Sequence, residues 1–330
     1  MTTGFPSSPF DAFVSFFDFP RQNSAFSSLP PSRLNSPMTN REEDGIMLRS
    51  LKQTIPALAT SDGAGVRIKR SLGQRQSVRM DPFLMLDEFG SDQPQDYIAG
   101  FPAHPHRGFE TVTYMIEGHM LHEDHLGNRG NLRNGGVQWM TAGRGIVHSE
   151  MPQQESGVMR GFQLWLNLPA AEKMKPAGYR DIQPEEIPIA RQPGVSVRVI
   201  AGELEIGGGA VTGAVTGGST EPVYADVHLE PGARVSLPVP QALNALVYLY
   251  EGVASLVSED RNQTLAPSSA NILDHGDEVL IEGGKAGAKL LLIAGRPIGE
   301  PVVQYGPFVM NTTAEIEQAL ADYRDGTLTA

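Results

Sequence analysis

Apolar and polar residues alternate in short runs along most of the chain, and turn residues separate the runs. Residues 66–70 alternate strictly, whereas the segments at 81–90 and 161–169 each contain a mainly apolar run. Successive side chains of a strand point to opposite faces, so strict alternation is typical of a strand with one buried face. A short continuous apolar run fits a strand that is buried on both faces. The pattern therefore predicts an all-β fold for most of the chain.

One segment near the C-terminus shows helical spacing instead. Thr312 and Glu315 have the spacing of a capping box, in which two side chains satisfy free backbone N–H groups at a helix start. Apolar residues follow at three- and four-residue intervals, and Gly326 favours termination. The apolar positions are Ile316, Ala319, Leu320 and Tyr323. These signals predict one C-terminal helix at residues 313–325, with its apolar side packed on a β-barrel.

The β pattern occurs twice. Residues 245–252 match residues 111–118 in their order of apolar, aromatic and acidic positions and in the closing glycine. With 330 residues, the chain exceeds the usual size of a single domain. We therefore expect one β unit at residues 47–182 and a second at 195–300, followed by a C-terminal segment at 301–330 that contains the helix.

The first 46 residues look different from the rest. Residues 1–46 mix Ser, Pro, Asn and Phe without periodicity, so we expect a tail with little order. They lack the basic start and apolar run of a secretory signal, and no later run reaches the roughly 18 apolar residues that span a membrane. We expect a cytoplasmic protein with no membrane association. Met38 and Met47 both precede the β pattern, and our hypothesis is that the natural chain starts at one of these internal methionines.

The amino-acid composition and net charge exclude several kinds of site and partner. The 36 glycines and 25 prolines suit a turn-rich β protein better than a helical one. No cysteine is present, which excludes disulfides, thiolate metal sites and thiol catalysis. A formal charge of −12 opposes attraction to polyanions, so we expect no direct binding of nucleic acid or anionic lipid. Any metal site must use nitrogen and oxygen ligands.

Two short segments about forty residues apart carry such ligands in pairs. His104 and His106 form the first pair, and His148 and Glu150 form the second. Residues i and i+2 of a strand share a face, so neighbouring strands of a barrel would bring three imidazoles and one carboxylate together. This set suits Fe(II), Mn, Ni, Cu or Zn, and we favour Fe(II) because the set leaves positions open for substrate or O₂. The alternative interpretation is that these pairs are solvated strand faces or core histidines.

These segments resemble a known metal motif. The first half is His104-x-His106-x-x-x-Glu110, and the second is Gly145-x-x-His148, as in cupins. Their surroundings are similar, more narrowly, to the pirin family of iron-binding bicupins. The matching runs are HPHRGFET (104–111), QWMTAGRG (138–145), HSEM (148–151) and YGPFVMN (305–311), and the likeness covers about residues 47–326. The resemblance implies two cupin (jelly-roll-like) β-barrels in tandem with a C-terminal helix.

The resemblance also concerns which carboxylate binds the metal. A typical cupin uses the acidic residue of the first motif, here Glu110, whereas pirins use that of the second, here Glu150. Carried over residue by residue, the pirin pattern implies His104, His106, His148 and Glu150 as ligands. Strand alternation permits both carboxylates, so Glu110 stays the alternative.

Two kinds of function are implied by the resemblance. One is flavonol 2,3-dioxygenase activity of the quercetinase type, in which Glu150, or Glu110 as the alternative, takes a proton from a flavonol-like small molecule. The other is a non-enzymatic, metal-dependent regulatory role that acts through a protein partner. We expect a monomer in either case.

The second β unit does not carry the motif. Alignment of the matching strands places Pro238, Pro240 and Asn244 at the three motif positions, and His275 is a single turn histidine. We therefore expect a cupin-like unit without metal ligands, as the resemblance also implies.

Other polar residues near the motif have less specific interpretations. His119, His122 and His125 follow Gly118, and we assign them to a hairpin between strands, with a second metal site as the alternative. Arg107 and Arg144 lie beside the ligand segments, where they either orient ligands or form surface ion pairs.

Overall fold

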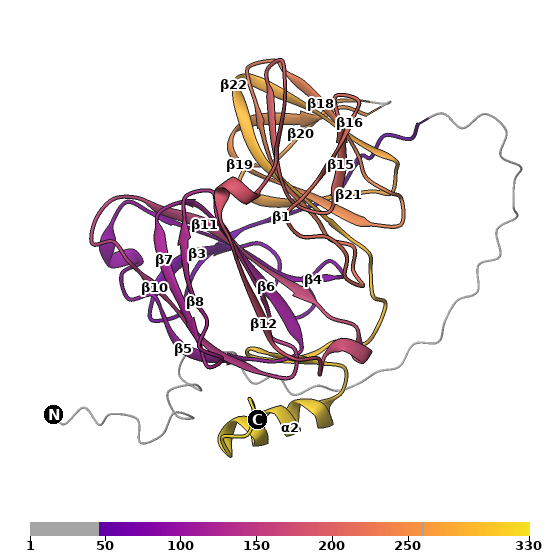
Figure 1. Cartoon of the computed structure of the whole chain (residues 1–330). Helices are drawn as coiled ribbons and strands as arrows, with labels where there is room; N and C mark the ends of the chain where they lie inside the picture. Colours follow the sequence, from indigo (N-terminus) through magenta and orange to yellow (C-terminus); the bar gives the residue numbers. More distant parts are fainter. Residues whose placement is uncertain (1–45, 259–260) are drawn as a thin grey trace, which may run out of the picture.

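The computed structural model describes residues 46–258 and 261–330 as two β-barrels, with one helix packed at the far end of the first (Figure 1). The expected N-terminal tail, up to residue 45, lies outside the described residues. We call strands β2 to β12 the leading barrel and strands β13 to β22, together with β1, the trailing barrel. The all-β prediction and the tandem of two cupin barrels are confirmed.

The leading barrel consists of two antiparallel sheets. One has the strand order β12-β9-β6-β11-β4-β3-β2, and the other has the order β5-β10-β7-β8. The strands are β2 (Leu58–Asp62), β3 (Val66–Arg70), β4 (Phe83–Ser91), β5 (Phe101–His106), β6 (Phe109–Glu117), β7 (His119–Asp124), β8 (Arg129–Arg133), β9 (Val137–Thr141), β10 (Ile146–Pro152), β11 (Met159–Asn167) and β12 (Gly178–Ile182). In β3, Val66 and Ile68 are buried while Arg67 and Lys69 are exposed, as the alternation predicts.

The trailing barrel is built around two long strands. β19 (Asn244–Leu256) and β22 (Glu278–Gly295) pair with each other along most of their length. β22 also pairs with β18 through its first half and with β17 through its second half, so one strand closes both sides of the barrel. The remaining strands are β1 (Leu51–Pro56), β13 (Ile189–Gln192), β14 (Val195–Ala201), β15 (Glu203–Ile206), β16 (Gly209–Thr212), β17 (Val223–Leu229), β18 (Arg234–Pro238), β20 (Gln263–Thr264) and β21 (Ser269–Leu273).

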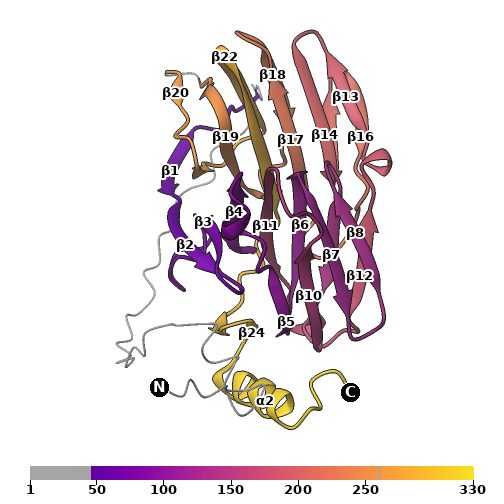
Figure 2. The ribbon, with the colours of Figure 1, turned by 90° about the vertical axis from the view of Figure 1, so that its left-hand side faces the viewer.

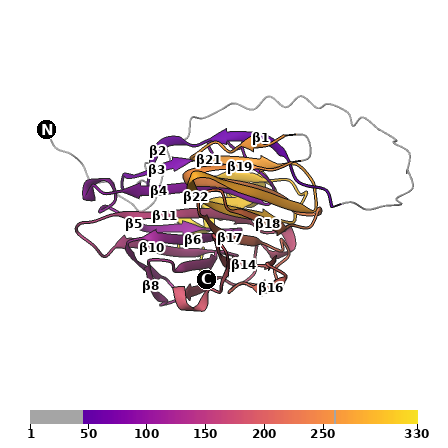
Figure 3. The same cartoon turned by 90° about the horizontal axis from the view of Figure 1, so that it is seen from above.

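Both ends of the described chain cross between the barrels. β1 pairs with β21, so the chain begins in the trailing sheet before it enters the leading barrel (Figure 3). After β22 it returns through β23 (Val303–Tyr305) and β24 (Phe308–Met310) to α2 (Thr313–Arg324), which lies beneath β5 and β10 (Figure 2). The two barrels are therefore joined by more than the linker between them.

The C-terminal helix that the sequence predicts is present, and its capping box forms. The Thr312 hydroxyl accepts from the Glu315 backbone N–H, and the Glu315 carboxylate accepts from the Thr312 N–H, so both halves of the capping box form. Ile316 and Ala319 are buried against β24 in an apolar cluster that also includes Val147. Val147 precedes His148, so the helix packs directly behind the second candidate motif.

A buried lysine fixes the C-terminal segment to the leading barrel. Lys173 is 1% exposed, and its Nζ donates to Gly108 O (2.8 Å), Asn167 Oδ1 (2.7 Å) and Val309 O (3.0 Å). Burial lowers the pKa of Lys173 to about 8. Gly108 has a φ of +89°, and a Cβ there would collide with Val309 O, so this close approach requires glycine.

The interface between the barrels is mainly apolar, with a few polar ties. Leu86 and Phe162 of the leading barrel share one buried cluster with Leu246 and Ile293 of the trailing barrel. Tyr114 Oη donates to Asp226 (2.7 Å) across this interface, and Tyr248 Oη donates to Glu88 (3.0 Å). Among the residues that the structure describes, no helix has the length and apolar character to span a membrane.

Candidate metal centre

Two adjacent antiparallel strands carry the candidate ligands. His104 and His106 lie on β5, and His148 and Glu150 lie on β10. The register places His148 directly opposite His104 and Ile146 opposite His106. Because side chains two apart share a face, both histidines of β5 project toward His148. The two motifs, about forty residues apart in the chain, therefore meet inside the leading barrel.

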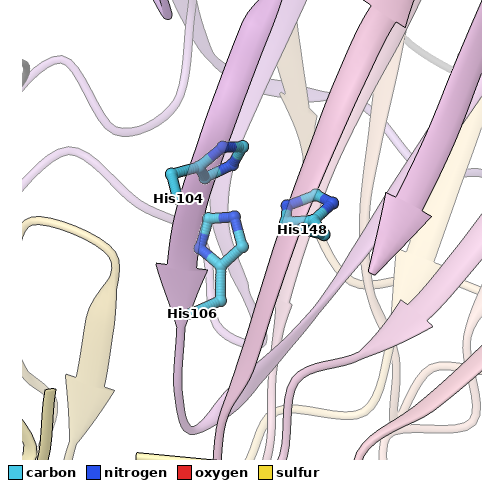
Figure 4. Close-up of side chains that lie close together, drawn as sticks. All are labelled: His104, His106 and His148. Carbon is cyan, nitrogen blue, oxygen red and sulfur yellow. The ribbon is translucent and has the colours of Figure 1, made fainter. Parts of the chain in front are cut away.

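The three imidazoles form one compact group (Figure 4). Each offers a ligand nitrogen, and these three nitrogens all lie within 4.8 Å of one another. The ring centroids of His104 and His148 are 4.3 Å apart, those of His104 and His106 are 4.7 Å apart, and those of His106 and His148 are 5.0 Å apart. This spacing fits three nitrogens around a single divalent ion.

The hydrogen bonds of these rings leave nitrogens available. His106 Nδ1 and His148 Nε2 are buried and have no hydrogen-bond partner. His104 Nδ1 lies 2.8 Å from Pro102 O, which leaves its Nε2 for another contact. Buried polar atoms are normally satisfied, so the unpaired His148 Nε2, in a ring beside those of His104 and His106, indicates a missing partner. The residues present therefore fit a bound transition metal.

Burial also keeps the rings in the form that binds metal. It lowers the pKa of His104, and it holds the pKa of His106 and His148 well below the usual range, with the neighbouring imidazoles adding to the effect. Only a neutral imidazole has a free nitrogen lone pair, so these histidines are ready to bind metal at neutral pH. Phe109 and Trp165 pack against His106 at ring-centroid distances of 5.2 Å and 5.4 Å and hold it in place.

Glu150 lies inside the same barrel but outside the group of three nitrogens. It is 3% exposed, and its carboxylate accepts from Thr113 Oγ1 (3.1 Å) and Gln163 Nε2 (3.4 Å). Burial raises the pKa of Glu150 to about 7, although the two hydrogen bonds oppose this shift. The pairing of β10 with β5 shifts register between His148 and Glu150, so the two do not continue one regular ladder.

The alternative carboxylate, Glu110, has structural partners instead. It lies on β6, and its oxygens accept from Thr141 Oγ1 (2.6 Å) and Trp139 Nε1 (3.2 Å). Lys175 Nζ lies 3.6 Å from Glu110 Oε1. Glu110 does not belong to the group of candidate ligands that lie within 4.8 Å of one another. Its contacts tie β6 to β9.

Sequence reasoning missed the position of His122. This residue lies on β7 opposite Glu150, it is 1% exposed, and its ring centroid is 5.2 Å from that of His148. Its Nδ1 is 3.3 Å from His148 Nδ1, and its Nε2 is 3.2 Å from Asp124 Oδ2. The available signal was the His122-x-Asp124 spacing, which puts both side chains on one face of a strand.

The other two histidines of this hairpin lie outside the group. His119 Nε2 bonds Asn131 at 2.9 Å on the surface, and His125 Nδ1 accepts from the Val147 backbone N–H at 3.2 Å. Both have the hairpin roles expected from the sequence.

Arg107 connects the first motif to the C-terminal helix. It is 3% exposed and donates to Asp322 Oδ2 (2.6 Å), to Leu328 O (3.2 Å) and to the backbone oxygen of Arg144. Its position next to His106 means that α2 and the chain end support β5 at the candidate site. The Arg144 side chain is exposed, and only its backbone takes part.

The trailing barrel has no comparable group among the described residues. Pro238 ends β18, Pro240 follows it, and Asn244 begins β19, where its Nδ2 donates to Asp81 O. His228 bonds Asp226 and Tyr250 beside the interface between the barrels.

Comparison with known proteins yields consistent matches. The Pirin family model matches residues 65–166, and the model of the Pirin C-terminal cupin domain matches residues 224–329. A Pseudomonas aeruginosa protein, whose name provisionally assigns it quercetin 2,3-dioxygenase activity, is 55% identical over 269 residues, or 81% of this chain and 94% of that protein. Human pirin is 43% identical over 281 residues, covering 84% of this chain and 93% of its own length.

A solved structure shows the same likeness in three dimensions. A crystal structure named quercetin 2,3-dioxygenase from Acinetobacter baumannii superposes with a TM-score of 0.76 at 33% identity, and the match covers 86% of this chain and 99% of that one.

Proposed function

The chain belongs to the pirin family, and we propose that it is a metal-dependent flavonol 2,3-dioxygenase of the quercetinase type. The names of the Pseudomonas aeruginosa relative and of the Acinetobacter baumannii structure support this class of activity. The observation that carries the proposal is the group of three neutral imidazoles, two of which have a buried nitrogen without a partner. A flavonol-like small molecule is the proposed substrate.

We propose His104, His106 and His148 as metal ligands, with Glu150 as the fourth. Fe(II) is our first choice, and Mn, Ni, Cu or Zn also suit nitrogen and oxygen ligands. A bound ion of this kind would act as a Lewis acid toward the flavonol oxygen and O₂. Glu150 is buried and lies two residues after His148 on β10, and we propose that its carboxylate, which here accepts from Thr113 and Gln163, turns toward the histidines to serve as a ligand.

The chain's own contribution to the reaction is mainly proton transfer and exclusion of water. Burial raises the pKa of the Glu150 carboxyl to about 7, so this group can take the proton of a flavonol hydroxyl near neutral pH. In the orientation turned away from the histidines, Thr113 and Gln163 hold the carboxylate in place for this proton transfer. Phe109 and Trp165 cover one side of His106 with apolar surface, which keeps water away from that ring.

The test is turnover by iron-loaded protein. Quercetin is followed by its absorbance and O₂ by an electrode, and we expect equal molar consumption of both. His106→Ala should abolish turnover because it removes one candidate ligand. His119→Phe, a histidine on the surface of β7, is the matched control and should retain full activity.

The competing function is non-enzymatic regulation through a protein partner. Full metal occupancy without turnover of quercetin or any other flavonol tested would contradict the enzyme and favour that role.

A further inference from the structure

We propose that His122 and Asp124 form a positioning pair that selects the metal-binding nitrogen of His148. The pair fixes the proton of His148 on Nδ1 and leaves the lone pair of Nε2 directed at His104 and His106. This inference rests on the proposed metal site. It concerns two residues that do not belong to the candidate ligand group.

The chain of hydrogen bonds begins at Asp124. Its Oδ1 accepts from the backbone N–H groups of Leu126 (2.9 Å) and Asn128 (3.0 Å), and its Oδ2 accepts from Asn128 Nδ2 (2.9 Å). Each of these partners can only donate, so the carboxylate is an acceptor throughout. The contact of Oδ2 with His122 Nε2 at 3.2 Å therefore requires a proton on Nε2.

The proton on His122 then determines the proton on His148. A neutral imidazole has one donor nitrogen and one acceptor nitrogen, so His122 Nδ1 must be the acceptor. His148 Nδ1 lies 3.3 Å from it, and these two nitrogens can bond only if His148 Nδ1 carries the proton. The free lone pair of His148 is consequently on Nε2, the buried atom without a partner. The assignment follows from the network of bonds and not from the coordinates of hydrogens.

The surroundings hold His122 in the required orientation. Its ring stacks on Tyr179 of β12, with centroids 4.0 Å apart and planes 10° apart. Gly130, opposite His122 on β8, leaves room for this tyrosine, because a Cβ there would overlap Tyr179 Oη. The stack fixes the plane of the ring, and the two hydrogen bonds fix its rotation. His122 therefore acts on the metal site through His148, without being a ligand itself.

The first measurement is metal affinity, with Co(II) as the probe. His122→Phe keeps the stack on Tyr179 but removes both hydrogen bonds, and we expect it to weaken Co(II) binding by about 10- to 100-fold, as is usual for such outer partners. His122→Gln keeps an oxygen that accepts from His148 Nδ1–H, so it should recover most of the loss. His119→Phe on the same strand is the matched control and should leave affinity unchanged.

The second measurement reads the proton directly in metal-free, full-length protein. The ¹⁵N chemical shifts of His148 should show protonated Nδ1 and unprotonated Nε2 in the wild type. His122→Phe should move His148 toward the opposite tautomer, and His122→Gln should restore the original one. A structural role that merely stabilised the fold would not produce this pattern, because it does not choose between ring nitrogens.

Two results would overturn the proposal. One is a wild-type His148 protonated on Nε2, and the other is a His122→Phe variant that folds and binds Co(II) as tightly as the wild type. Failure of the proposed metal site would look different, because the wild type itself would then bind no Co(II) while the tautomer of His148 could still be measured.

Discussion

The two barrels have a common strand plan and differ in what fills them. The trailing interior is lined by Val197, Val227, Val247 and Leu292, all completely buried, in a cluster made only of apolar side chains. The leading interior buries charged and polar residues at equivalent depth. These residues are His106, Thr113, His122, Gln138, His148 and Glu150. One barrel is thus packed for stability, whereas the other keeps groups that a purely structural core would exclude.

The distribution of unsatisfied atoms sharpens this difference. Within residues 46–258 and 261–330, most buried side-chain atoms without a hydrogen-bond partner belong to the leading barrel, and they include both polar atoms of Gln138 as well as Trp165 Nε1. Tyr224 Oη is the example in the trailing barrel. Each such unpaired group lowers the free energy of unfolding by about 1–3 kcal/mol. Local violations of packing rules concentrate where a protein has chemistry to perform, and the apolar interface that the two barrels form together offsets them.

The largest expected effect comes from making the leading barrel resemble the trailing one. His106→Leu should weaken Co(II) binding by about 1,000-fold, or about 4 kcal/mol, because a ligand is lost. The metal-free variant should nevertheless be more stable than metal-free wild type by about 1 kcal/mol, since a buried nitrogen without a partner is replaced by carbon. Metal titration and urea unfolding measure the two effects. A destabilised metal-free variant would refute the idea that function costs stability here.

The reverse change weakens the trailing core. Leu292 is completely buried on β22, and Leu292→Ala should lower the free energy of unfolding by about 3 kcal/mol through the cavity it leaves. Co(II) affinity of the folded protein should stay within about twofold, because Leu292 faces away from the interface and the site. Urea unfolding and metal titration test both statements. A parallel loss of affinity would mean that the barrels are coupled and that the division of roles is wrong.

Sequence reasoning predicted the strands, the helix and the three histidines for one physical reason. Period-two alternation and the capping box are local patterns, so they can be read from neighbouring residues. The choice between Glu110 and Glu150 is not local. Both have the correct parity, and the register shift after His148 that decides where Glu150 points depends on pairing with β5. Local spacing therefore cannot rank them.

His122 and β1 escaped prediction for the same reason. The role of His122 depends on the register of β7 against β10, which brings it beside His148, 26 residues along the chain. β1 belongs to the trailing sheet because it pairs with β21, more than 200 residues later. No pattern within either segment specifies these distant partners.

A smaller effect is a pH dependence of the free energy of unfolding, which we expect from a buried lysine of the leading barrel and not from the core of the trailing barrel. The pKa of buried Lys173 in the folded state is about 8, below its ordinary value of 10.5, so the unfolded chain binds this proton more tightly. The contribution of Lys173 to the free energy of unfolding must then rise with pH between about 8 and 10.5. The free energy of unfolding of wild type minus that of Lys173→Met should increase by about 2 kcal/mol from pH 8 to pH 10. Urea unfolding at several pH values measures this difference.

The control for that experiment lies in the trailing barrel. Val247→Ala removes no titratable group, so its difference from wild type should not vary over the same pH range. A flat profile for Lys173→Met would show that the three acceptors of Lys173 compensate fully for its burial.

The smallest expected effect concerns the alternative carboxylate. Glu110→Gln keeps an oxygen that accepts from Trp139 or Thr141, and the residue is not in the candidate ligand group, so Co(II) affinity should change by less than about twofold. Glu150→Gln is the matched change on β10, and it should weaken binding by about tenfold if that carboxylate turns to the metal. Titration of both variants with Co(II) compares them under one condition. A larger loss in Glu110→Gln than in Glu150→Gln would return the ligand role to the first motif, and the leading barrel would then use the carboxylate of a typical cupin.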